Sequence, residues 1–223
     1  LNGDIISPKP EILIQLKDEN PYLVLDDTSS FRIYLKTPTQ TAANQVYFAS
    51  SGLQFYPAAL PANKAKIEWN PSFTEDGKYE LYVRAHDRSG NASGSIEYRI
   101  GFEVVNRATI TQVYNYPNPF STKTHFVFTL TGSEVPDQFR IQILTITGKV
   151  VRDIRRDELG PIRIGRNITS FAWDGRDEFG DQLANGIYLY RVVTSIKGQE
   201  MERRETAGDS FFHKGYGKMY LMR

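Results

Sequence analysis

The stretch "FAWDGRDEFGDQLANGIYLYRV" (residues 171–192) carries more information about the fold than any other part of the sequence. Trp173 is expected in the core, and Asp174 and Gly175 begin a loop that ends at Gly186. Glycine adopts positive φ freely, and aspartate and asparagine bond their own backbone, so these residues favour turns. The aromatic and β-branched residues that follow Gly186 predict a strand. A turn-rich loop that leads into such a strand is typical of an antiparallel β-protein.

Runs of strand-forming residues continue in both directions from this stretch. In "KYELYVRA", Tyr79, Leu81, Val83 and Ala85 alternate with polar residues, so one face is predicted to be core. The runs are EILIQL, SFRIYLK, QVYFAS, KAKIEW, KYELYVRA and GSIEYRIGFEVV in the first half, and THFVFTL, FRIQILT, KVVRDI, PIRIGRNITSFAW, GIYLYRVVTS, QEMERRET and GKMYLM in the second. About seven strands in roughly 100 residues is the spacing of an immunoglobulin-like sandwich. The sequence therefore predicts an all-β protein with two tandem immunoglobulin-like β-sandwich domains.

Length and charge both support two domains. Its 223 residues fit two domains of about 100 residues each. Residues 1–106 hold 10 basic and 13 acidic groups and residues 107–223 hold 17 and 13, which gives net charges of −3 and +4. The stretch "VNRATITQV" is expected to end the first strand system. We predict an accessory immunoglobulin-like or fibronectin-like sandwich at 1–106 and a second sandwich at 107–223.

The overall composition excludes several classes of protein. A net charge of +1 gives no electrostatic case for binding nucleic acid or an anionic membrane. No stretch approaches the roughly 20 apolar residues of a membrane-spanning helix. The sequence contains no cysteine, so it forms no disulfide and no thiolate site. Because it begins at Leu1 without a leader, we expect a processed product or a piece of something longer.

The segment "YPNPF" stiffens the chain where the second half begins. Pro117 and Pro119 fix their own φ and push Tyr116 and Asn118 towards extended geometry, which excludes a helix or a central strand. We interpret the segment as a rigid entry to the second domain, in which Tyr116 and Phe120 cover the open end of the sandwich with aromatic surface.

Acidic residues gather in the loop that follows Trp173. Asp174, Asp177, Glu178 and Asp181 are oxygen ligands of the kind that calcium prefers. Their spacing differs from that of an EF-hand, however, and aspartate in turns commonly bonds its own backbone. Both readings remain open, and the sequence predicts no cofactor.

Other chemistry finds little support. The three histidines, His86, His125 and His213, are dispersed and form no spaced ligand pair, so a zinc site is not expected. The adjacent Asp26 and Asp27 fit a solvated turn better than a pair of glycosidase carboxylates. The sequence contains no Gly-x-Ser-x-Gly elbow and no P-loop or dinucleotide fingerprint. We therefore expect no catalysis from this chain.

Two features allow recognition instead. Tyr47, Phe48, Phe55 and Tyr56 could form a sugar-stacking platform, although alternation predicts half of them in the core. The tail places Met219 and Leu221 on one face of a last strand and Tyr220 and Met222 on the other, as in a strand added to a sheet edge. The residues that we expect to serve recognition are Gly217, Lys218, Tyr220, Leu221 and Arg223.

The second half resembles the FlgD-like immunoglobulin domain found at the ends of exported Bacteroidetes proteins. The resemblance extends from about Val113 to the C-terminus and rests on five motifs in order: YPNPF, THFVFTL, IQILTITGKVVRDI, FAWDGRDEFGDQLANGIYLYRV and GKMYLMR. The residues of its structural motif are Tyr116, Pro117, Asn118, Pro119, Phe120, Trp173, Asp174, Gly175, Gly186 and Tyr188.

That resemblance implies a C-terminal sorting domain recognised by outer-membrane components of the type IX secretion system. It implies an exported protein, at the outer membrane, at the cell surface or outside the cell. The stretch "QEMERRETAGDSFFHKGY" departs from the usual pattern, in which the final strand follows almost directly. This longer tail is similar to the C-terminal region of large gingipain-type, sortase-like proteins, whose cysteine peptidase domain would lie upstream.

Two alternatives remain beside this reading. One is an adhesion or carbohydrate-binding module of a secreted multidomain protein. The other is a flagellar-type assembly scaffold, which would form oligomers, whereas a docking module is expected to be a monomer.

Overall fold

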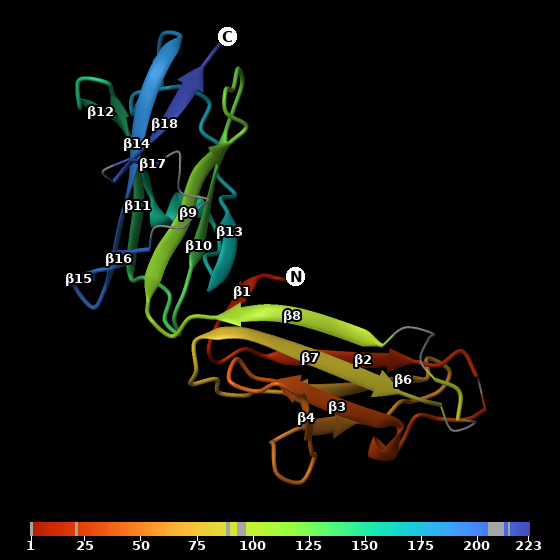
Figure 1. The fold of residues 1–223 in the computed structure, drawn as a ribbon. Coiled ribbons are helices and arrows are strands. Elements are labelled where there is room, and N and C mark those ends of the chain that lie inside the picture. The colour runs from red at the N-terminus through yellow and green to blue at the C-terminus, as the bar shows by residue number, and fades with distance from the viewer. Residues whose placement is uncertain (1, 21, 88–89, 93–96, 205–211, 214) are drawn as a thin grey trace. The chain divides into compact units, whose positions relative to one another are not determined.

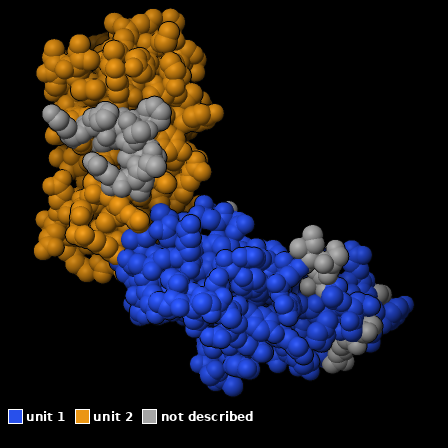
Figure 2. Space-filling model, viewed as in Figure 1, with its two compact units in different colours: residues 1–106 blue, residues 107–223 orange. Residues whose placement is uncertain are grey.

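A computed structural model gives the fold of the chain. It describes residues 2–20, 22–87, 90–92, 97–204, 212–213 and 215–223, with the backbone alone at 212–213. The chain forms two compact units, residues Leu1–Asn106 (unit 1) and Arg107–Arg223 (unit 2), which are coloured separately in Figure 2. Each unit has its own hydrophobic core.

Unit 1 consists of two sheets. The first has the strand order β1-β8-β7-β3-β4 and the second the order β2-β6-β5. Within the described residues of unit 1, β1 pairs parallel with β8, and the other strand pairs are antiparallel. The elements are β1 (Ile5–Ile6), β2 (Ile12–Lys17), the 3-10 helix η1 (Thr28–Ser30), β3 (Phe31–Lys36), β4 (Asn44–Val46), β5 (Gln54–Tyr56), β6 (Lys64–Trp69), β7 (Gly77–Ala85) and β8 (Tyr98–Val104).

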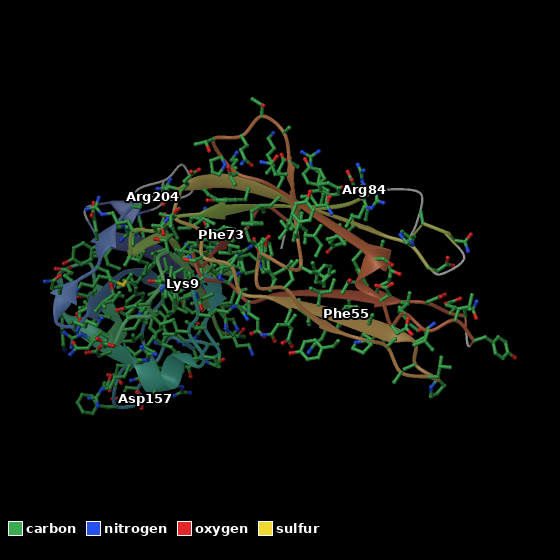
Figure 3. All side chains as sticks on the ribbon, turned by 90° about the horizontal axis from the view of Figure 1, so that it is seen from below. Lys9, Phe55, Phe73, Arg84, Asp157 and Arg204 are labelled. Carbon is green, nitrogen blue, oxygen red and sulfur yellow. The ribbon has the colours of Figure 1, made fainter. Side chains whose placement is uncertain are left out.

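The core of unit 1 lies between its two sheets. Aromatic rings form much of it: Phe73 packs at centroid distances of 4.7 Å from Tyr79 and 5.5 Å from Phe102 (Figure 3). Strand β7 buries Tyr79, Leu81, Val83 and Ala85, which confirms the face predicted from their alternation. The hydrophobic effect favours this arrangement because each buried large side chain contributes about 1.5–3 kcal/mol.

Unit 2 also contains two sheets. One has the order β13-β10-β9-β16, and the other has the order β12-β11-β14-β18-β17, with β15 attached to β14 (Figure 1). The elements are β9 (Thr109–Tyr116), β10 (His125–Leu130), β11 (Gln138–Thr145), β12 (Val150–Arg155), the helix α1 (Arg156–Leu159), β13 (Gly165–Ile168), β14 (Gly186–Ile196), β15 (Gln199–Glu200), β16 (Glu202–Arg203), β17 (Phe212–His213) and β18 (Tyr216–Leu221).

The core of unit 2 joins these two sheets through aromatic contacts. Phe128 of β10 lies 4.5 Å from Phe139 of β11, and Phe126 of β10 lies 5.2 Å from Tyr190 of β14, measured between ring centroids. Trp173 is fully buried in the same core. Because every one of these pairs links one sheet to the other, the two layers of unit 2 form one sandwich.

The all-β, two-sandwich fold class predicted from the sequence is confirmed. Two details differ from the sequence-based expectation. The short strands β1 and β5 were not expected, because runs of two or three residues give no periodic pattern. The segment that was expected to end the first strand system instead forms β9, which pairs with β10 of unit 2. The described part of the chain has no helix with the length and apolar character of a membrane span.

Candidate functional site

The strand β18 is an inner strand although it comes last in the sequence. It pairs antiparallel with β14 from Gly217 opposite Tyr190 to Leu221 opposite Gly186, and its beginning also pairs with β17. Figure 1 shows β14 and β18 side by side. One edge of β18 is therefore occupied by β14 from Gly217 to Leu221.

The other edge of β18 is held by the YPNPF segment. The Asn118 side chain donates from Nδ2 to the oxygen of Lys218 (3.0 Å) and accepts at Oδ1 from the Tyr220 N–H (3.0 Å). The Phe120 N–H then donates to the oxygen of Tyr220 (3.0 Å), and the Met222 N–H donates to the oxygen of Phe120 (2.8 Å). The segment thus continues the sheet beside β18. The side-chain amide of Asn118 makes the hydrogen bonds that a main-chain peptide group would make in a regular strand.

The last residue is fixed by the loop before β14. Asn185 donates from Nδ2 to the main-chain oxygen of Arg223 (3.0 Å) and accepts from its N–H (2.9 Å). The Arg223 guanidinium donates to the carbonyl oxygens of Leu183 (3.0 Å) and Asp174 (2.5 Å). We call the set Asn118, Phe120, Asp174, Gly175, Leu183 and Asn185 the terminal clamp. It holds the residues 218–223.

Gly175 leaves the space that Arg223 and Leu221 occupy. Its φ is +77°, and a Cβ there would lie 2.6 Å from Nη2 of Arg223 and 2.9 Å from Cδ2 of Leu221. Both the backbone conformation and the close approach therefore require glycine.

Trp173 and Tyr188 fix the loop that forms half of the clamp. The Trp173 indole N–H donates to the oxygen of Arg176 (2.8 Å), and its ring lies 5.5 Å from Phe120 and 5.8 Å from Tyr188. The Tyr188 hydroxyl donates to the oxygen of Ala184 (2.8 Å), and burial raises the pKa of this phenol. The predicted core position of Trp173 is confirmed by its complete burial.

The YPNPF rings lie differently from the expectation. Phe120 is buried against Trp173, whereas Tyr116 belongs to β9 and keeps 69% of its surface exposed. The two rings therefore do not form a shared aromatic surface over the end of the sandwich. The segment contributes main-chain and amide hydrogen bonds to β18 instead.

The residues expected to serve recognition divide between the two faces of β18. Leu221 is fully buried, and Gly217 is buried beneath Tyr190, whose ring an added Cβ would overlap. Arg223 is occupied by the clamp. Lys218 and Tyr220 point outwards, with the Lys218 ammonium 5.2 Å from the Tyr220 ring centroid.

The outward face of β18 and β14 carries an exposed, partly apolar strip. Register places Ile187 opposite Tyr220. Their exposed fractions are 39% and 37%, and that of Met222 is 60%. We call this the docking strip, and its residues are Ile187, Tyr216, Lys218, Tyr220 and Met222.

Two carboxylates of the acidic loop accept hydrogen bonds from the backbone of the loop itself. Asp177 Oδ1 accepts from the Phe179 and Asp181 N–H groups (3.0 and 2.9 Å), and Asp174 Oδ1 accepts from the Arg176 N–H (3.2 Å). These are the backbone bonds expected of aspartate in turns. Among the described residues, no group of three or more His, Cys, Asp or Glu side chains is arranged to hold a metal ion.

Glu178 ties the acidic loop to the neighbouring strand. It accepts from the Asp153 N–H (3.1 Å) and from the Arg152 guanidinium (3.0 Å), and these two contacts lower its pKa. Arg152 also contacts Glu158 of α1 and lies over the Phe171 ring. The loop that carries part of the clamp is therefore also attached to β12 through Glu178.

The histidines lie apart from this site. His86 Nδ1 lies 3.1 Å from the oxygen of its neighbour Asp87, and His125 Nδ1 lies 2.9 Å from the oxygen of Thr169. The side chain of His213 lies outside the described residues.

The four aromatic residues considered as a sugar platform do not share a surface. Phe48 and Phe55 pack against the core of unit 1, which confirms that half of the set is internal. Tyr47 and Tyr56 are exposed, but Lys66 lies 4.6 Å from the Tyr56 ring centroid and the Tyr56 hydroxyl donates to Glu68 (2.9 Å).

Sequence reasoning missed Asn185 and Leu183 as members of the clamp. Asn185 was visible only as a turn residue before Gly186, and Leu183 contributes a main-chain oxygen that no side-chain pattern marks. Both contacts join residues about forty positions apart in the chain, a separation at which local patterns carry no information.

Three solved structures resemble the chain weakly. A crystal structure of dimeric latent PorU from Porphyromonas gingivalis is 17% identical with a TM-score of 0.39, and the match covers 100% of this chain and 19% of that chain. The FN1-FN3 domains of chicken CNTN1 are 11% identical with a TM-score of 0.30, covering 100% and 64%. The fibronectin(III)-like modules of Clostridium thermocellum CbhA are 13% identical with a TM-score of 0.25, covering 96% and 94%. At these scores the likenesses carry no argument about function.

The chain thus spans only 19% of the length of the PorU chain. No curated protein matches the sequence. The gingipain-type parent inferred from the long tail stays a prediction. Residues 117–198, which begin at the first proline of YPNPF and run through β14 to the following turn, match the family model of the FlgD Ig-like domain.

Proposed function

We propose that the chain is a non-catalytic module that docks an exported bacterial protein at the type IX secretion machinery or at the cell surface. The match of residues 117–198 to the FlgD Ig-like domain supports this, together with the order of the motifs around it. The observation that carries the proposal is that β18 is bonded on both edges while the docking strip on its outward face stays exposed.

Because both edges of β18 are hydrogen-bonded, they limit the ways in which a partner can bind this strand. Strand addition requires free main-chain groups at a sheet edge. Here Asn118 and Phe120 occupy the outer edge from Lys218 to Met222. A partner therefore contacts the folded surface through side chains, and aromatic residues and methionine are enriched in the centres of such interfaces.

The clamp supplies the rigidity that such docking needs. Trp173 and Gly175 are buried within unit 2 and do not reach a partner, but they set the position of Leu221 and Arg223. Gly217 and Leu221 likewise position the strip from beneath. A surface that is ordered before binding loses less conformational entropy when the complex forms.

Unit 1 acts as a spacer in this proposal. On the outward face of β3, β7 and β8, the Arg84 guanidinium lies 5.3 Å from the Tyr34 ring centroid, and that of Arg99 lies 5.2 Å from the Tyr82 ring centroid. Arg99 also pairs with Glu80 at 2.7 Å. Cations thus cover these tyrosine rings, which leaves them poorly placed to stack on a sugar.

The test is the export of a reporter fused to residues 107–223 in a bacterium with a type IX secretion system. The double variant Tyr220→Ser, Met222→Ser removes the apolar part of the docking strip. Truncating a hot-spot side chain at the centre of an interface costs more than about 1 kcal/mol, so the loss of two such side chains is expected to lower surface delivery by about tenfold or more. The matched control is Ile168→Ser, which removes a side chain that is 60% exposed on the other sheet.

Normal export of the double variant would refute the docking proposal, provided that its thermal unfolding matches that of the control. Deletion of residues 217–223 is a poorer test. It removes Met219 and Leu221, which are fully buried, so loss of folding and loss of docking would give the same result.

A further inference from the structure

Asn185 combines a chemically labile sequence with a structural role in the terminal clamp. It precedes Gly186, and asparagine followed by glycine is the pair most prone to deamidation, because glycine presents no side chain to block attack by its main-chain nitrogen. Asn185 is exposed, and a Cβ added to Gly186 would meet no heavy atom within 4 Å. The surroundings of the pair therefore leave room for the reaction.

We propose that Asn185 is a deamidation site, and that its conversion loosens the hold of the clamp on Arg223. The main-chain nitrogen of Gly186 attacks Cγ of Asn185, its proton leaves, and the side-chain nitrogen departs as ammonia. Water then opens the resulting succinimide to aspartate or isoaspartate. Nothing else is consumed or released.

The clamp geometry explains why this change matters. In the asparagine form, Nδ2 donates to the main-chain oxygen of Arg223 at 3.0 Å while Oδ1 accepts from its N–H at 2.9 Å. Deamidation replaces Nδ2 with a carboxylate oxygen, which cannot donate. Two acceptors then face each other at hydrogen-bond distance.

Isoaspartate has a second effect. It routes the main chain through the former side chain, which lengthens the backbone by one carbon directly before β14. Gly186 is the residue of β14 that lies opposite Leu221. The first pair of the β14–β18 ladder is then displaced.

The closed clamp also protects its own asparagine. Both polar atoms of the Asn185 amide are engaged by Arg223, which restrains the side-chain rotation that ring closure requires. Deamidation therefore proceeds from the open clamp, and its rate reports how often Arg223 is released.

The experiment ages the full chain at mildly alkaline pH and follows each asparagine by peptide mapping with mass spectrometry. The chain contains a second Asn-Gly pair, Asn2–Gly3, which serves as an internal reference. Gly175→Ala, whose added Cβ would contact Arg223, is expected to speed conversion at Asn185 several-fold and to leave Asn2 unchanged. Gly180→Ala is the control, because it has a similar φ of +89° in the same loop and nothing within 4 Å of its Cβ.

A second measurement tests the structural consequence. Hydrogen exchange of the peptide that covers residues 216–223 is expected to be about tenfold faster in Asn185→Asp than in the unchanged chain, as for the loss of one hydrogen bond. Asn2→Asp, the same change in unit 1, is expected to have no effect on that peptide.

Two results would overturn the proposal. The first is that Asn185 stays intact, even in Gly175→Ala, over a period in which Asn2 converts. The second is that exchange in residues 216–223 is the same in Asn185→Asp and in the unchanged chain.

Discussion

Replacing Gly175 with alanine tests how much the contact of this loop with Leu221 and Arg223 contributes to the stability of unit 2. Its φ of +77° lies in the left-handed region, where a residue with a Cβ costs about 1–2 kcal/mol. The added Cβ would also lie 2.6 Å from Nη2 of Arg223 and 2.9 Å from Cδ2 of Leu221, and overpacking of this kind costs about 1–3 kcal/mol. The free energy of unfolding of unit 2 is therefore expected to fall by about 2–5 kcal/mol.

Gly180→Ala separates the two contributions. Gly180 lies in the same loop at φ +89°, and its Cβ would meet nothing within 4 Å, so only the backbone cost of about 1–2 kcal/mol applies. Urea unfolding followed by Trp173 fluorescence measures both variants, in a Trp69→Phe background that silences unit 1. Equal losses for the two alanine variants, to within about 0.5 kcal/mol, would refute the argument that Gly175 is needed for space.

Two further predictions concern the surroundings of the clamp. Gly217→Ala places a methyl carbon 2.0 Å from Cζ of Tyr190, so unit 2 is expected to lose about 3 kcal/mol or more in the same assay. A loss below about 1 kcal/mol would contradict the packing. In the folded chain, the hydrogen bond from the Asp153 N–H of β12 and then the contact with Arg152 lower the pKa of Glu178. The stability that this carboxylate contributes is therefore present above the ordinary glutamate pKa and is lost as the pH falls below it. Glu178→Gln is expected to lower the melting temperature at neutral pH and to flatten its decline towards about pH 3, and identical pH profiles for the two proteins would contradict this assignment.

The fold class and the buried faces could be read from the sequence because the two-residue period of a strand is local. The alternation placed Met219 and Leu221 on one face of β18, and the structure buries both side chains. Turn chemistry was local as well. Gly175 and Gly186 have φ of +77° and +155°, as their positions in the loop predicted.

The pairing of β18 could not be read in the same way. Asn118 contacts Lys218 and Tyr220 across 100 and 102 residues of sequence, and these bonds involve main-chain groups that every residue possesses. A proline-rich segment indicates stiffness but does not indicate which strand it will accompany. The amphipathic tail was therefore expected at an open edge, whereas the fold places it inside the sheet.

The late position of β18 in the sequence affects the order in which the two units can fold. Met219 and Leu221 are fully buried in the core of unit 2, so this sandwich cannot complete its core until β18 has emerged from the ribosome. Unit 1 has all of its strands once Val104 is available. Contacts between residues far apart in sequence also form slowly, since long loops must close first. Unit 1 can thus fold cooperatively during synthesis, while unit 2 stays accessible to chaperones and proteases until β18 has been made.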